Sequence, residues 1–298
     1  MKSLNIVTWN VQWCKGIDGK IDAQRIIDGA YALCDFDILC LQEISVNFPG
    51  LTEDTPADQV ALFQSLLPNY HIAFGAAIDE QPSGQVTRQQ FGNLIASRLP
   101  ILRTQRINLP SPVDTNSPLP GMERMCLTCT VQAPWGPLRI MTTHLEYYSQ
   151  PQRLAQAKAL FECHDTASLR ATHPTPEGRA QTPYQAKPET LDAFLCGDFN
   201  FTAESAEYQQ IIQQNCINPW FDAWPLCHPD QPHDPTFHLY DHTYGPEPVC
   251  CDFFFISQSL RSRVQSIRVD TQTQASDHQP VHLVLGEPHS EPRNTNTP

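Results

Sequence analysis

The sequence predicts an α/β protein built from layers of sheet and helix. Residues 4–41 read as a short apolar strand, a helix and a second apolar strand, which is the βαβ pattern of layered folds. Both strands end on polar residues, Asn10 after the first and Gln42-Glu43 after the second. In such folds ligands bind beyond the carboxyl ends of the strands, so functional side chains are expected there.

The elements of the first half follow from hydrophobic periodicity. Residues 4–9 alternate between two faces, as a strand does, and residues 21–34 carry apolar side chains at helical spacing. Residues 37–41 form a continuous apolar strand that ends at Gln42-Glu43. After a loop at 46–57, we expect a helix at 58–67, strands at 71–75 and 92–97, and a proline-rich loop at 108–121.

The second half continues the alternation. Residues 125–132 and 138–143 predict a hairpin across an Ala-Pro-Trp-Gly-Pro turn. A long helix is expected at 151–170, with Pro151 in its first turn and an apolar stripe behind it. The other expected elements are a mobile polar insertion at 172–190 away from the site, a strand at 192–196, a helix at 204–214, a long loop at 218–250, and strands at 252–256, 263–269 and 281–285.

Composition limits the classes of protein to consider. The 298 residues are 40% hydrophobic, and we expect one domain at 1–286 and a disordered polar tail at 287–298. No stretch has the length of a signal peptide or a transmembrane segment, which favours the cytoplasm. The formal charge of −13 disfavours tight non-specific binding of long polyanions, although a bound cation can reverse the sign locally.

The cysteines are expected to be free, buried thiols. Their number, eleven, is odd, and several lie inside apolar runs. Cys126 and Cys129 are three residues apart in a predicted strand, so they face opposite sides. A zinc or redox site at this pair is therefore disfavoured.

Residues 195–200 join an apolar strand to a glycine, an acid, an aromatic residue and an amide. Asp198 and Asn200 are two positions apart, so they share one face if the strand geometry continues. One interpretation is an Asx turn with ordinary turn formers. The other is a carboxylate and an amide placed for catalysis, and the remaining strand ends decide between the two.

Polar residues with a similar placement recur along the chain. At or near predicted strand ends lie Asn10, Glu43, His144, Asp198, Asn200, Asp252 and the Asp277-His278 pair. Each has an ordinary alternative, such as a turn residue, a solvated strand end or, for His144, a surface or satisfied core histidine. Together they offer the carboxylates, amides and imidazoles that a hard cation and phosphoester hydrolysis require.

The ordered motifs TWN, LQE, GNLIASR, TTHLE, GDFN, PTF, CDFFFIS and SDHQPV resemble those of the endonuclease/exonuclease/phosphatase superfamily. The resemblance covers residues 4–286, and GDFN together with LQE and SDH carries most of it. It implies a four-layer α/β sandwich of two facing mixed β-sheets with outer helices. It also implies a metal-dependent phosphoesterase related to deoxyribonuclease and neutral sphingomyelinase.

Carried over by position, the resemblance implies a metal site. Glu43 would be the principal ligand, Asn10 would assist it, and Asp277 would lie on or near the ion. Carboxylate and amide oxygens favour a magnesium or manganese ion (Mg2+ or Mn2+) over a soft metal.

The resemblance also implies roles for the other residues. Asp198 would position or deprotonate the attacking water, Asn200 would hold the phosphate or Asp198, and His144 would stabilise the developing charge. His278 would act as the general base or bind a phosphate oxygen, with Asp252 accepting its other ring N–H. The resemblance leaves open which of these groups is the base.

Departures from the family patterns bear on the substrate. The chain has His144 where abasic-site endonucleases carry a tyrosine, and no arginine stands beside Asp252, which argues against inositol phosphates. Phe237, Tyr240 and Tyr244 are expected either to stack on a base or a lipid headgroup or to anchor a surface loop. No basic stripe supports a grip on long duplex DNA.

The predicted function is hydrolysis of phosphodiester bonds, or of phosphomonoesters, by metal-dependent attack of an activated water. The partner is a phosphate-ester substrate, nucleic acid included, and DNA, RNA, nucleotides, phospholipids and sugar phosphates all stay open. The alternatives are a catalytically silent binding module of the same fold, a sphingomyelinase-like phospholipid phosphodiesterase and, with little support, a zinc or thiol enzyme. The sequence indicates neither the number of ions nor the oligomeric state.

Overall fold

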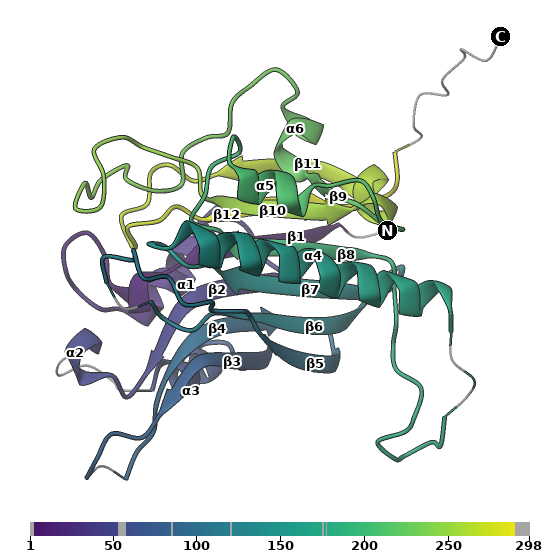
Figure 1. The fold of residues 1–298 in the computed structure, drawn as a ribbon, viewed down its shortest axis with the longest axis horizontal. Helices are drawn as coiled ribbons and strands as arrows, with labels where there is room; N and C mark the ends of the chain where they lie inside the picture. The colour runs from purple at the N-terminus through teal and green to yellow at the C-terminus, as the bar shows by residue number, and fades with distance from the viewer. Residues whose placement is uncertain are drawn as a thin grey trace.

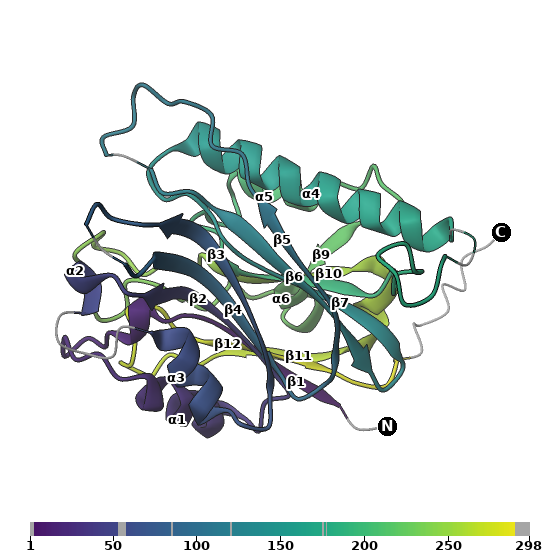
Figure 2. The same cartoon turned by 90° about the horizontal axis from the view of Figure 1, so that it is seen from below.

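Two six-stranded sheets pack face to face in the computed structural model, which describes residues 3–52, 58–84, 86–119, 121–174, 176 and 178–289. Helices cover the outer face of each sheet, so the layers run helix, sheet, sheet, helix (Figure 1 and Figure 2). Both sheets contain parallel and antiparallel pairs. The predicted four-layer sandwich of mixed sheets is confirmed.

The first sheet has the strand order β11-β12-β1-β2-β4-β3. Its strands are β1 (Leu4–Asn10), β2 (Ile38–Val46), β3 (His71–Glu80), β4 (Gln89–Ser97), β11 (Val264–Val269) and β12 (Val281–Leu285). β1 and β2 run parallel because the helix α1 (Ala23–Leu33) connects them. Asn10 is in register with Gln42, so the carboxyl end of β1 lies beside the residues just before Glu43.

The second sheet has the order β5-β6-β7-β8-β10-β9. Its strands are β5 (Ile101–Asn108), β6 (Met125–Ala133), β7 (Gly136–His144), β8 (Ala193–Asp198), β9 (Trp220–Asp222) and β10 (Asp252–Ser257). The helix α4 (Gln150–Thr172) joins the parallel strands β7 and β8, and it lies along the outside of this sheet (Figure 1). His144 is in register with Asp198, which in turn pairs with Asp252 at the start of β10.

Three apolar cores hold the layers together. The central core, between the sheets, includes Ile6, Ile95, Leu127 and Phe254, all of them fully buried. A second core lies under α1 and α3 (Gln59–Leu66), and a third under α4 and α5 (Ala206–Ile211). The remaining short elements are η1 (Gln12–Cys14), α2 (Pro49–Thr52), α6 (Ala223–Cys227) and η2 (Gln258–Arg263).

Several expectations about individual elements need correction. β2 does not end at Gln42-Glu43 but continues to Val46, with a register shift against β4 between Leu41 and Ile44. The sequence predicts no strand where β5 lies, because an edge strand with arginines on it lacks the apolar signature of a buried strand. The predicted loop at 218–250 contains β9 and α6, which are too short to leave a periodic pattern.

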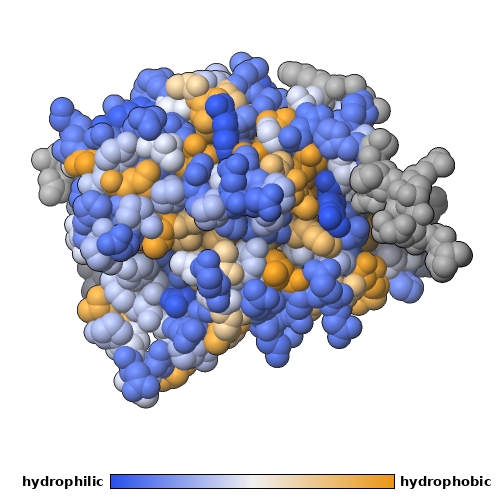
Figure 3. Space-filling model, turned by 90° about the horizontal axis from the view of Figure 1, so that it is seen from above, coloured by the Kyte–Doolittle hydropathy of each residue, from blue (hydrophilic) through white to orange (hydrophobic). Residues whose placement is uncertain are grey.

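The polar insertion and the tail are described only in part. The described residues of the insertion follow the carboxyl end of α4, at the right of Figure 1. Of the predicted tail, residues 290–298 lie outside the described residues, and the His289 N–H donates to the Ser262 carbonyl. None of the described helices has the length and apolar character to cross a membrane. The face seen in Figure 3 carries small hydrophobic patches separated by hydrophilic side chains.

The buried histidine of α4 makes stability sensitive to acid. His164 is fully buried, stacks on Trp220 at 3.7 Å and lies 3.0 Å from an Arg139 nitrogen. Burial, followed by the charge of Arg139, lowers the pKa of His164 to about 3. Between about pH 6.5 and 3 the unfolded chain therefore binds a proton at this residue that the folded chain does not, and stability is lost as the pH falls.

We expect His164→Gln to flatten this dependence. Below about pH 6 the slope of the unfolding free energy against pH should fall by about 1.4 kcal/mol per pH unit, the contribution of one proton. Urea unfolding from pH 6 to 4.5 measures the slope independently of the absolute stability of the variant. His173→Gln, at an exposed position, is the control. Equal slopes in His164→Gln and the unsubstituted protein would contradict this assignment.

Candidate active site

The predicted site residues lie together at one end of the sandwich. The parallel pairs β1/β2 and β7/β8 end side by side there, and β10 begins opposite the end of β8. Glu43, His144, Asp198, Asn200, Asp277 and His278 line one pocket. Asn10 and Asp252 are buried beneath it and form hydrogen bonds to the lining residues.

Asp198 is the centre of the polar cluster. Its Oδ2 accepts a hydrogen bond from Asn10 Nδ2 at 2.9 Å and lies 3.4 Å from His144 Nε2 and 3.6 Å from His278 Nε2. Its Oδ1 accepts the backbone N–H of Asn200 at 2.9 Å. Burial acts to raise the pKa of this carboxyl, but the charge of His278, together with the hydrogen bonds from Asn10 and the Asn200 backbone, outweighs burial and lowers it. Asp198 is therefore a carboxylate.

The glycine before Asp198 is required by the fold. Gly197 has a φ of +134°, and a Cβ at this position would lie 1.9 Å from the carbonyl oxygen of Thr143. Only glycine lets β8 approach β7 so closely. This contact brings the end of β8 against His144, so the glycine sets the distance between the acid and the imidazole.

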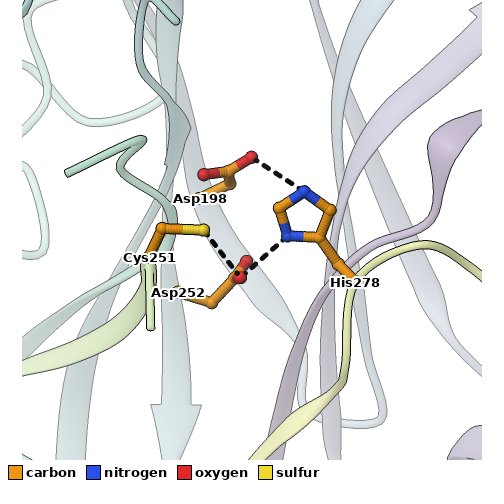
Figure 4. Close-up of side chains that lie close together, drawn as sticks. All are labelled: Asp198, Cys251, Asp252 and His278. Atoms are coloured by element: carbon orange, nitrogen blue, oxygen red, sulfur yellow. Dashed lines mark hydrogen bonds and ion pairs between the residues drawn. The ribbon is translucent and has the colours of Figure 1, made fainter. Parts of the chain in front are cut away.

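His278 is held from two sides. Its Nδ1 is 2.9 Å from Asp252 Oδ2, and its ring stacks on Phe237 with the centroids 4.2 Å apart (Figure 4 shows the Asp198, His278 and Asp252 chain). Thr236 Oγ1 accepts the backbone N–H of Asp252. Burial acts to lower the pKa of His278, but Asp252 and Asp198 outweigh it and raise the pKa to about 10. The ring is therefore an imidazolium.

His144 has the opposite protonation state. Burial, followed by the charge of Arg124, lowers the pKa of His144 to about 3. Its Nδ1 lies 3.8 Å from Glu43 Oε1, and its other ring nitrogen faces Asp198. The site thus presents a carboxylate between a neutral imidazole and an imidazolium.

Glu43 and Asp277 line the same pocket as Asp198. Glu43 has a φ of +62° within the irregular part of β2, and Asn10 Nδ2 donates to its Oε1 at 3.1 Å. Burial, followed by the charge of Asp277, raises the pKa of Glu43 to about 7. Burial also raises the pKa of Asp277, whose Oδ2 accepts from Gln12 Nε2 at 2.8 Å.

This oxygen-rich group fits a hard divalent cation. Within the described ranges, no lysine or arginine forms an ion pair with Glu43 or Asp277, whereas Asp198 lies 3.6 Å from the imidazolium of His278. Buried carboxylates without a cationic partner are costly, and a bound divalent ion compensates for that cost.

A second group of side chains brings possible metal-binding atoms close together. One atom each from Asp198, Cys251, Asp252 and His278 lie within 4.8 Å of one another (Figure 4). Burial raises the pKa of the Cys251 thiol well above its usual value, which keeps it protonated. Both ring nitrogens of His278 already face carboxylates. These two features make the second group a poorer cage for a hard ion.

The pocket has a volume of about 380 Å³. Besides the predicted residues, its lining includes Gln12 and Arg124, which sequence reasoning missed. Gln12 follows Asn10 closely, but only its bond to Asp277 reveals a role. Arg124 lies in a loop without periodicity, and its buried side chain is paired with Glu146 at 3.3 Å.

Of the three aromatic residues considered for substrate stacking, two line the pocket and one anchors a loop. Phe237 and Tyr244 line the pocket, with ring centroids 6.3 Å apart. Tyr240 is absent from the lining, and its hydroxyl donates to the Thr271 carbonyl at 2.8 Å. The loop-anchor interpretation therefore holds for Tyr240.

Comparison with solved structures finds the same fold. An endonuclease/exonuclease/phosphatase from Beutenbergia cavernae is 21% identical, with a TM-score of 0.67 over 96% of this chain and 72% of that one. A mannosyl-6-phosphatase from Bacteroides thetaiotaomicron is 18% identical, with a TM-score of 0.64 over 95% and 99% of the two chains. The catalytic domain of human Nocturnin with bound sulfate is 18% identical, with a TM-score of 0.61 over 95% and 92%. At this level of identity the likeness establishes the fold alone.

Comparison with curated proteins finds no match. The family model described as the Endonuclease/Exonuclease/phosphatase family matches residues 7–278. That span runs from β1 to His278 and includes every residue of the polar cluster. The chain therefore belongs to the endonuclease/exonuclease/phosphatase family.

Proposed function

We propose that this protein is a divalent-cation-dependent phosphoesterase that hydrolyses small phosphodiesters. The observation that carries the proposal is the position of the Asp198 carboxylate, between the neutral imidazole of His144 and the imidazolium of His278. Hydrolysis of a phosphodiester needs an acceptor for the proton of water and donors for the oxygens that gain charge. Asp198 and His278 supply these two functions side by side.

Glu43, Asp277 and Asn10 are the residues proposed to hold the cation. The carboxylate oxygens of Glu43 and Asp277 suit a magnesium or manganese ion, and a soft ion does not fit this donor set. The side chain of Asn10 supports the site by donating from Nδ2 to Glu43 Oε1 at 3.1 Å. When bound, such a cation neutralises charge that develops on the phosphoryl oxygens. Gln12 fixes the Asp277 carboxylate by donating to it at 2.8 Å.

The proposed reaction is an in-line displacement at phosphorus. The oxygen of a water molecule forms a bond to phosphorus, and the bond from phosphorus to the leaving oxygen breaks. Asp198 accepts the proton of the water, and the leaving oxygen takes up a proton from His278. Asp252 keeps the ring of His278 in position through Nδ1. The backbone N–H of Asn200 orients Asp198, and the side chain of Asn200 donates to the Leu145 carbonyl.

Charge and size favour a small substrate over a long nucleic acid. The chain has a formal charge of −13. In the described lining of the pocket the only lysine or arginine is Arg124, and it is already paired with Glu146. Binding of long polyanions depends on many lysines and arginines along the contact. Phosphomonoesters are the second candidate, because a solved structure with this fold is a mannosyl-6-phosphatase.

Hydrolysis of bis(p-nitrophenyl) phosphate with Mg2+ or Mn2+ tests the proposal, with p-nitrophenyl phosphate as the monoester arm. We expect release of p-nitrophenolate that EDTA abolishes and that re-added cation restores. Treatment with N-ethylmaleimide should leave the rate unchanged, since the thiol of Cys251 is buried and protonated. Full activity after removal of all divalent cations would refute the proposal, and loss of activity on thiol modification alone would point to a thiol enzyme.

A further inference from the structure

We propose that the pocket binds an uncharged apolar group that is esterified to the substrate phosphate, which extends the proposed function to a class of substrate. Beside the acids and imidazoles, the pocket is lined by an apolar wall that consists of Phe48, Leu51, Ile78, Phe91 and Met122. None of these five residues belongs to the sequence motifs that resemble those of the family. The wall is therefore formed by residues that lie outside those motifs.

The wall is built by β3, β4, the segment from Phe48 through α2, and the loop that holds Met122. Ile78 and Phe91 are partners across the antiparallel pair β3/β4, so their side chains lie on the same face. The register of this pair shifts between Ala76 and Ile78, and the shift is what sets Ile78 opposite Phe91. Phe48, from the segment after β2, meets Phe91 edge to face with centroids 6.4 Å apart.

The strands β3 and β4, which carry part of the wall, pack closely where they approach the site. A Cβ on Gly92 would lie 1.9 Å from the carbonyl oxygen of Gly75, so the two strands come closer here than a larger residue permits. Phe91 is only 6% exposed and is fixed by this approach. The wall is thus formed before a substrate arrives, which lowers the cost of binding.

The chemistry of the wall selects apolar groups. Its methionine, leucine, isoleucine and phenylalanine side chains offer no strong hydrogen-bonding group, so they recognise shape and apolar surface. The acidic and basic residues of the described lining belong to the polar cluster around Asp198 and to Arg124, and the tyrosines Tyr147, Tyr148 and Tyr244 complete its polar part. A phosphate at the cluster would therefore place one of its ester groups against the wall.

The pocket limits the size of that group. A volume of about 380 Å³ accommodates a phosphate with one short chain or ring. A nucleobase is the competing occupant, because Phe237 and Tyr244 offer rings on which a base can stack. Base recognition also uses hydrogen bonds to the base edges, and the wall does not provide them. We infer a short alkyl or acyl-bearing ester, from a lipid or from another small phosphodiester.

The test keeps the leaving group constant and varies the retained ester. We compare methyl, butyl and hexyl p-nitrophenyl phosphate with p-nitrophenyl thymidine 5′-phosphate, all with Mg2+. We expect kcat/KM to rise by about fourfold for each methylene that enters the wall, until the chain fills the pocket. A preference for the thymidine ester over the hexyl ester would overturn the proposal in favour of a nucleobase, and equal kcat/KM for the methyl and hexyl esters would overturn it outright.

Variants test whether the wall residues cause the preference for longer alkyl esters. In Ile78→Ser the ratio of kcat/KM for the hexyl ester to that for the methyl ester should fall at least tenfold, because a polar group replaces apolar contact. Ile217→Ser is the matched control, since Ile217 is 48% exposed and lies outside the pocket, and its ratio should not change. Leu51→Ser repeats the test if Ile78→Ser does not fold. An unchanged ratio in a folded wall variant would contradict the assignment.

The result separates this inference from the proposed function. Hydrolysis of the methyl ester tests the function, and the dependence on chain length tests the wall. If no ester is hydrolysed, the proposed function fails, and the wall is then tested by thermal shift with methylphosphonate and hexylphosphonate. A larger shift with hexylphosphonate, lost in Ile78→Ser, would support the wall without any turnover, and equal shifts would reject it.

Discussion

Asp198→Asn is expected to lower the rate of cation-dependent hydrolysis of bis(p-nitrophenyl) phosphate by about a thousandfold, with the fold retained. The substitution keeps the size and shape of the side chain but removes the charge that accepts the proton of water. Asparagine can still accept the hydrogen bond from Asn10, and the circular dichroism spectrum should therefore match that of the unsubstituted protein. Steady-state kinetics with saturating Mg2+ measures the loss.

A second measurement, the pKa of His278, tests whether the charge of Asp198 influences the neighbouring imidazole. Asp198 is one of three carboxylates, with Asp252 and Asp277, that raise the pKa of His278, so the pKa of His278 should fall in Asp198→Asn, as followed by NMR titration. Asp28→Asn, at an exposed position on α1, is the matched control and should change neither the rate nor the pKa. A folded Asp198→Asn protein with full activity would remove Asp198 from the mechanism.

The sequence predicts the fold well because the buried strands have a strong apolar signature. β1, β8, β10 and β12 are found within a residue or two of their expected bounds, since each is a short apolar run next to turn or polar residues. β5 is missed because it is an edge strand whose side chains alternate between partial burial and exposure. Its place is set by pairing with β6, and a single strand's composition does not report that pairing.

The polar cluster of the site is predictable because its residues follow buried strands that have a strong apolar signature. The apolar wall is not predictable in this way. Asp198 and His144 lie where buried strands end, so their positions follow from the strands. Glu43 was expected after a strand and instead lies inside β2, because the irregular pairing with β4 turns it into the pocket. Phe48 and Met122 come from irregular segments, and only the assembled fold brings them to the pocket.

Glu43→Gln is expected to abolish stabilisation by the cation. A cation present at a hundred times its dissociation constant stabilises the native state by about 2.7 kcal/mol, which corresponds to a rise in Tm of roughly 5 °C for a domain of this size. The unsubstituted protein should show this rise with Mg2+ or Mn2+ and lose it with EDTA. The variant should show little or none, because the principal carboxylate is gone, and thermal unfolding measures the difference without any substrate.

The same variant should be more stable than the unsubstituted protein in EDTA at pH 8. The folded pKa of Glu43, about 7, lies above its ordinary value of 4.5, so the stability that this group contributes is present below pH 4.5 and is lost as the pH rises through 7. At pH 8 the ionised, cation-free carboxylate costs roughly 2–3 kcal/mol, and glutamine removes that cost. Glu80→Gln, at an exposed position on β3, is the control. A cation-induced rise in Tm that survives in Glu43→Gln would place the cation elsewhere, and the buried group formed by Asp198, Cys251, Asp252 and His278 would then be the site to test.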